Sequence, residues 1–251
     1  LQADLHLRLG ELAEAERLVE RAAALVDEVG VPAFDDMGVV RTRGELALRS
    51  DDPVTALQLA KTALDHRPVT PRGEARLWNL AAIAHNILGD PTAAADALDH
   101  CLQAEEAAGL ETFLANTHGN YAEVLLALGD PIGAAMHQLA AFEWARAMVD
   151  LTLVAYSQMI AARFAFDDGA TADAVKMQSA ADVILASQGM SLYLVDAEQR
   201  QVLLDAARGV LGAADFERAR LEGESTPADQ LADQTEAILR RRAASPSTTG
   251  G

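Results

Sequence analysis

One short motif recurs along the chain at nearly constant spacing. Each copy is a break in a helical segment, then the start of a new helix, then an alanine at a fixed offset. The alanines are separated by 41, 38, 40 and 40 residues, at Ala15, Ala56, Ala94, Ala134 and Ala174. Such a period is typical of helical solenoids, whose repeats bury their apolar faces against one another. The spacing predicts an all-α chain, built as a right-handed solenoid of antiparallel helix pairs.

The residues at the breaks have conformational reasons for recurring. Glycine can adopt the left-handed conformation that closes the preceding helix. An aspartate can then accept hydrogen bonds from the free amides of the next helix, and a proline fits its first turn. Three breaks carry both residues in succession, at Asp52-Pro53, Asp90-Pro91 and Asp130-Pro131. The alanine that follows lets two helices approach closely.

Between the breaks, apolar residues recur every three or four positions, as on one face of a helix. The predicted helices, taken as consecutive pairs, are 11–29 and 32–49, 53–66 and 71–88, 91–108 and 111–128, 131–148 and 150–167, and 170–188 and 191–208. The residues before position 10 read as the end of a helix already under way, so we expect a piece of a longer protein. We predict three regions: helical repeats over 1–209, capping helices over 210–242 and a flexible tail over 243–251.

The charge of the chain argues against several classes of partner. The formal net charge is −18, and a surface this acidic repels nucleic-acid phosphates and anionic lipids. We therefore expect no direct nucleic-acid or membrane binding. The basic cluster 240–242 is too short to reverse this and is interpreted as a solvated helix end. The single cysteine, Cys101, excludes an intrachain disulfide and favours a reducing, cytoplasmic location.

One repeat resembles the tetratricopeptide pattern. In that family Trp, Gly, Tyr, Gly and Ala stand at the positions that Trp78, Ala82, His85, Gly89 and Ala94 occupy here. Alanine and histidine replace the first glycine and the tyrosine. The period near 40 is also longer than the usual 34 of that family.

Longer repeats of this kind are similar to those of large actinobacterial signal-transduction ATPases, among them AfsR-, MalT- and LuxR-like regulators and cyclase-ATPase fusions. The stretch 145–150 resembles the Ala-Arg-x-x-Gly-Asp that closes repeats there, with Val149 in place of the glycine. The run 211–223 is similar to a segment that ends those repeat regions, with a short helix expected over 226–232. The resemblance implies a nucleotide-binding ATPase module in the parent protein. Many such regulators continue into a DNA-binding helix-turn-helix, whereas this sequence continues into the tail 243–251.

The sequence contains no recognisable catalytic, cofactor-binding or metal-binding pattern. No glycine-rich loop precedes Lys-Ser or Lys-Thr, and the six histidines show neither H-E-x-x-H nor Cys/His spacing. Asp96, Asp99 and His100 share a helix face that we interpret as solvated, and Cys101 is interpreted as a core residue. We therefore expect no enzyme activity, no cofactor and no metal.

The predicted binding surface is a groove. In tetratricopeptide geometry the first helix of each repeat lines a concave face, and counting back from each break places eleven residues toward it: Arg41, Glu45, Arg76, Asn79, Ile83, Asn86, Asn116, Glu123, Tyr156, Met159 and Arg163. Arginine, asparagine and apolar side chains in an acidic chain suit a peptide or helix of a protein partner.

The expected function is that of an interaction or sensor scaffold in a larger bacterial regulatory protein. Its partners would be a protein or peptide and the other domains of the parent chain. Two alternatives stay open: a repeat domain that senses a small molecule and controls an attached ATPase, and a structural module for self-association.

Overall fold

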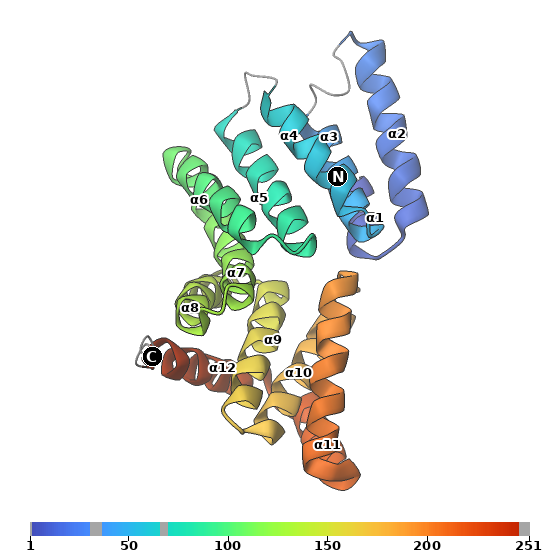
Figure 1. The fold of residues 1–251 in the computed structure, drawn as a ribbon. Helices are drawn as coiled ribbons and strands as arrows, with labels where there is room; N and C mark the ends of the chain where they lie inside the picture. Colours follow the sequence, from blue (N-terminus) through green and yellow to red (C-terminus); the bar gives the residue numbers. More distant parts are fainter. Residues whose placement is uncertain (1, 31–36, 66–69, 246–251) are drawn as a thin grey trace. The chain divides into compact units, whose positions relative to one another are not determined.

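The computed structural model describes residues 2–30, 37–65 and 70–245, which form helices joined by turns (Figure 1). The helices are α1 Gln2–Arg8, α2 Leu12–Glu28, α3 Met37–Arg49, α4 Pro53–Asp65, α5 Pro71–Ile87, α6 Pro91–Ala107, α7 Glu111–Ala127, α8 Pro131–Met148, α9 Leu151–Asp167, α10 Thr171–Ser187, α11 Leu194–Ser225 and α12 Ala228–Ala243. The described ranges contain no strand, so the predicted all-α class is confirmed. The handedness and the period of the solenoid stay predictions.

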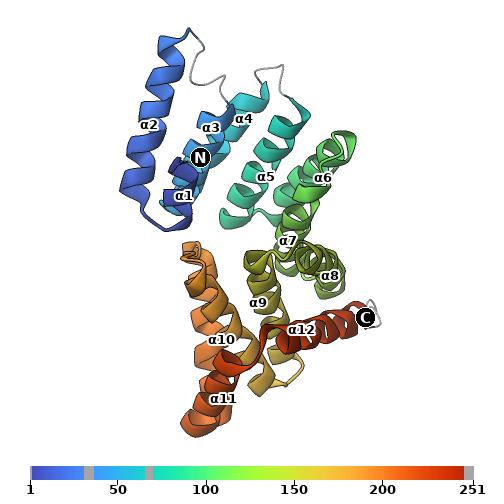
Figure 2. The same ribbon diagram turned by 180° about the vertical axis from the view of Figure 1, so that it is seen from behind.

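The helices divide into two compact units. Unit 1 comprises Leu1–Thr117 together with Gly189–Leu194, and unit 2 comprises His118–Gln188 together with Val195–Gly251. In unit 1, one buried cluster joins Val40, Leu77 and neighbours on α4. In unit 2, one buried cluster contains the fully buried Phe142 and Phe164. There α12 packs against α8 and α9, as Figure 2 shows from behind.

The five sequence breaks have the backbone conformation expected of them. The residue at each break has a left-handed φ, from 60° to 78°, at Gly10, Asp51, Gly89, Gly129 and Gly169. The five repeated alanines are all buried, with at most 1% of their surface exposed. Both observations agree with close packing between successive helices.

The three Asp-Pro pairs begin helices as predicted. The Oδ1 atoms of Asp52, Asp90 and Asp130 accept hydrogen bonds from backbone N–H groups three residues later, at 3.0, 3.0 and 2.9 Å. Each proline opens its helix, where its missing N–H costs nothing. The caps therefore fix where α4, α6 and α8 begin.

The turn between α8 and α9 carries strain, because Val149 adopts a left-handed conformation with φ 56°. A β-branched residue is a rare occupant of that region, which costs roughly 1–2 kcal/mol for non-glycine residues. Its side chain is 76% exposed and contributes little packing. We therefore expect Val149→Gly to stabilise the chain by about 1 kcal/mol, measured by urea unfolding. Val149→Ala is the control, because alanine keeps the strain; an equal gain from alanine would contradict the explanation.

The C-terminal helices differ in extent from the prediction. α11 continues to Ser225, through a non-helical Gly212 with φ 75° and ψ 166°, so that two helical stretches meet at a kink. The short helix expected over 226–232 is in fact the longer α12. The expected helix start at 32, the helix end at 66 and the tail residues 246–251 lie outside the described residues.

Candidate functional site

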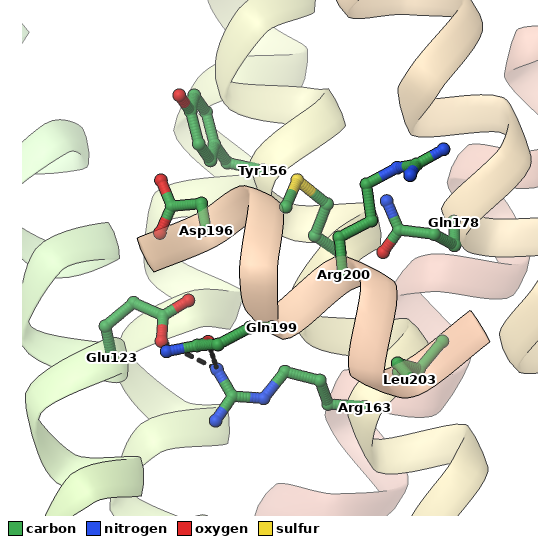
Figure 3. Close-up of a pocket in the computed structure, with 9 residues that line it drawn as sticks. Glu123, Tyr156, Arg163, Gln178, Asp196, Gln199, Arg200 and Leu203 are labelled. Atoms are coloured by element: carbon green, nitrogen blue, oxygen red, sulfur yellow. Dashed lines mark hydrogen bonds and ion pairs between the residues drawn. The ribbon is translucent and has the colours of Figure 1, made fainter. Parts of the chain in front are cut away.

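A partly open pocket lies in unit 2, among four helices (Figure 3). Its empty volume is about 350 Å³, counted out to the open mouth. Most of the residues that line it are polar or charged, although the surface that they present to the space is mainly apolar: Glu123, Tyr156, Met159, Arg163, Gln178, Asp196, Gln199, Arg200 and Leu203.

Helical spacing explains how the lining residues come together. Tyr156, Met159 and Arg163 lie on α9 at positions three and four apart, which places them on one face of that helix. α11 contributes a face with the same spacing, at 196, 199 and 203. α7 supplies Glu123 and α10 supplies Gln178.

A small polar network forms one wall of the pocket. Arg163 Nη1 donates to Glu123 Oε2 at 2.7 Å and to Gln199 Oε1 at 3.1 Å (Figure 3). The side chains of Arg163 and Glu123 are each 34% exposed, so the ion pair is open to solvent and to a ligand. These bonds hold the Arg163 guanidinium in a defined position before anything binds.

A second arginine lies on the other side of the pocket. Arg200 donates from Nε and Nη2 to the two carboxylate oxygens of Asp182, at 2.7 and 2.5 Å. These hydrogen bonds favour the charged form and raise the pKa of Arg200 above its usual value. Gln178 Nε2 also donates to Asp182 Oδ1, at 3.1 Å, so Asp182 fixes two lining side chains at once.

Four of the eleven predicted groove residues line this pocket: Glu123, Tyr156, Met159 and Arg163. The other seven lie in unit 1. Arg41 pairs with Asp4 at 2.5 Å, Glu45 accepts a hydrogen bond from Tyr193, and Arg76 stacks over the ring of Phe113. Of the rest, Asn79, Ile83 and Asn86 are part-buried on α5, and Asn116 is exposed on α7.

Five lining residues were not predicted, and three of them had a signal in the sequence. Asp196, Gln199 and Leu203 stand 40 residues after Tyr156, Met159 and Arg163. Extending the count by one more repeat would have found them. Gln178 and Arg200 lacked such a signal, because their positions depend on Asp182.

The other candidates from the sequence have structural roles. His100 stacks on Trp78, with 4.5 Å between ring centroids. Cys101 is fully buried and its thiol donates to the carbonyl of Ala75, while burial raises its pKa to about 12. In the basic cluster, Arg240 pairs with Glu143 and Glu236, and Arg242 pairs with Asp168.

Two searches of the described residues bear on ligands and membranes. No three His, Cys, Asp or Glu side chains within 2–30, 37–65 and 70–245 are grouped as they would be to hold a metal ion. In the same part of the chain, every helix is too short or too polar to cross a membrane.

Comparison of the chain with known protein families, curated proteins and solved structures found no match in any of the three.

Proposed function

We propose that this chain is a protein-interaction module and that its unit 2 pocket binds a short peptide segment of a partner. The observation that carries the proposal is that four helices of unit 2 contribute side chains to one pocket. Several of its polar groups are held in place by hydrogen bonds to one another or to Asp182, which lowers the entropy cost of binding.

The chemistry of the lining suits a peptide. The side-chain amides of Gln178 and Gln199 can pair with main-chain N–H and C=O groups. Tyr156 and Met159 offer an aromatic and a flexible apolar surface for a side chain. Positive and negative groups are balanced in the pocket, although the whole chain carries a net charge of −18. Recognition would therefore depend on local hydrogen bonds and shape rather than on net charge.

We further propose that the module acts as the interaction or sensor arm of a larger bacterial regulator. The resemblance of the repeats and of the 211–223 segment to signal-transduction ATPases supports this setting. Binding at the pocket would then favour one arrangement of α9 and α11 over another. This change in conformation would pass the signal that a partner is bound to the other domains of the parent protein.

A peptide selection on the whole chain tests the proposal. Peptides from a displayed random library would be synthesised with a fluorophore and their Kd measured by fluorescence polarisation. We expect Arg163→Ala and Tyr156→Ala each to weaken binding at least about tenfold, which corresponds to about 1.4 kcal/mol. Arg240→Ala is the matched control, because Arg240 is also ion-paired but lies on α12 outside the pocket.

Two results would contradict the proposal. One is that every selected peptide binds both pocket variants as tightly as the unaltered chain. The other is a thermal-shift screen in which small molecules, and no peptide, stabilise the chain in an Arg163-dependent way. That outcome would favour the alternative of a small-molecule sensor.

A further inference from the structure

A short non-helical segment of the chain is held in unit 1 in the manner of a bound peptide. Residues 190–193 connect α10 to α11 and have no regular secondary structure. Together with positions 189 and 194 they are part of unit 1. Their contacts are with α1, the turn that follows it, and α3.

Main-chain groups make part of the contact. The amide of Ser191 donates to the carbonyl of Arg8 at 3.2 Å. Arg49 Nη1 donates to the carbonyl and to the hydroxyl of Ser191, at 3.2 and 3.3 Å. Both main-chain groups of one residue are thus bound, which is how proteins recognise extended peptides without regard to sequence.

A tyrosine two residues later makes the specific part of the contact. The hydroxyl of Tyr193 donates to Glu45 Oε1 at 2.5 Å. The guanidinium of Arg49 lies over the Tyr193 ring, 4.5 Å from its centroid, and its Nε donates to the same Glu45 oxygen at 3.0 Å. Glu45 thus binds the hydroxyl of Tyr193, and Arg49 covers one face of its ring. Phenylalanine at this position would keep the ring contact and lose the hydrogen bond.

Two glycines allow the close approach of this segment. A Cβ atom on Gly10 would lie 3.1 Å from Ser191 Oγ, and one on Gly189 would lie 2.9 Å from Leu9 Cδ2. Both glycines also have a positive φ, of 74° and 64°. The segment and its site are thus matched in shape as well as in polarity.

We propose that Arg8, Glu45 and Arg49 form a second peptide-binding site, specific for an extended segment with a tyrosine two residues after a main-chain-bound residue. Residues 189–194 occupy this site in cis. The side chain of Arg49 is only 8% exposed, so losing Ser191 and Tyr193 without replacement would cost free energy. A partner segment of the same chemistry would offset that loss, and it must compete with the tethered segment. The site is separate from the unit 2 pocket, and its failure would leave that proposal standing.

Binding of a synthetic peptide to the whole chain tests this site. The probe is a fluorescein-labelled peptide with the sequence of residues 187–196. We expect the Tyr193→Ala chain to bind it at least tenfold more tightly than the unaltered chain, because the cis segment no longer fills the site. Adding Arg49→Ala to the Tyr193→Ala chain should abolish the tighter binding, whereas adding Arg43→Ala should not. Arg43 is the matched control on the same helix, paired with Glu20 instead. No binding to the Tyr193→Ala chain, or a gain that persists without Arg49, would overturn the proposal.

A second measurement needs no variant. Hydrogen exchange of residues 189–194 in the unaltered chain is followed by mass spectrometry with and without excess peptide. We expect the peptide to speed exchange there, because displacement exposes the Ser191 amide that Arg8 now protects. The same peptide with phenylalanine in place of tyrosine should act more weakly. Unchanged exchange at saturating peptide would overturn the proposal independently of how the variants fold.

Discussion

Gly223→Ala is expected to be among the most destabilising single-methyl changes in the chain, at a cost of about 3 kcal/mol. A Cβ atom at this buried position would lie 2.8 Å from the Cα and 3.0 Å from the carbonyl carbon of Lys176, and nearer still to its carbonyl oxygen. These are backbone atoms of α10, so the clash can be relieved only by moving a whole helix. An ion pair beside this contact, between Lys176 Nζ and Glu222 at 2.9 Å, further limits such movement.

Another glycine of the same helix provides the control. Gly209 is exposed, and a Cβ atom there would meet nothing within 4 Å. Gly209→Ala should therefore be neutral or stabilise the chain by up to about 1 kcal/mol, through the better helix propensity of alanine. Urea unfolding followed by circular dichroism measures both variants. Equal unfolding midpoints for the two would show that α10 and α11 do not touch at this position.

The same substitution has a consequence for the pocket. The clash at Gly223 pushes α10, and α10 carries both the lining residue Gln178 and Asp182, to which Gln178 and Arg200 are hydrogen-bonded. Gly223→Ala should therefore also weaken the binding of peptides whose affinity depends on Arg163, even at temperatures where the chain stays folded. Gly209→Ala should leave their Kd unchanged.

The helices could be predicted closely because the signals that begin and end them are local. A left-handed residue at each break and an aspartate cap after it act within one turn of chain, and Gly89 with Asp90 is an example. The kink at Gly212 lies close to the predicted boundary between the helix 191–208 and the capping helices from 210, but its exact position was not predicted, because an isolated glycine in a helical pattern has several interpretations.

Two of the nine lining residues, Gln178 and Arg200, were beyond a local reading of the sequence. Tyr156 and Arg163 could be placed by counting back from the break that follows their helix. The bond between Arg200 and Asp182 joins α11 to α10, and no pattern within either helix predicts it. The unit 1 site was missed for the same reason, since Tyr193 meets Glu45 across a large separation in sequence.

Glu105→Gln is expected to stabilise the chain at neutral pH by about 1 kcal/mol, because a buried carboxylate charge costs more free energy to desolvate than a neutral amide does. Glu105 lies on α6 and is only 3% exposed. Its Oε1 accepts a hydrogen bond from the hydroxyl of Thr117 at 3.0 Å, while its Oε2 is buried without a hydrogen-bond partner. Burial raises the pKa of this carboxyl above its usual 4.5. Glutamine keeps the acceptor for Thr117 and removes the charge.

The advantage of glutamine should depend on pH in a defined direction. Well below pH 4.5 the carboxyl is protonated in both the folded and the unfolded chain, so Glu105 costs little there. As pH rises through the unfolded and then the raised folded pKa, the unfolded chain ionises first and gains stability relative to the folded chain. The gain from Glu105→Gln should therefore grow from acidic to neutral pH and then level off. Glu106→Gln is the control, because Glu106 is the exposed neighbour on the same helix. Urea unfolding at pH 4 and pH 7 measures the change in the free energy of unfolding. An increase that is equal at both pH values, or that Glu106→Gln also produces, would show that the buried charge of Glu105 is not its cause.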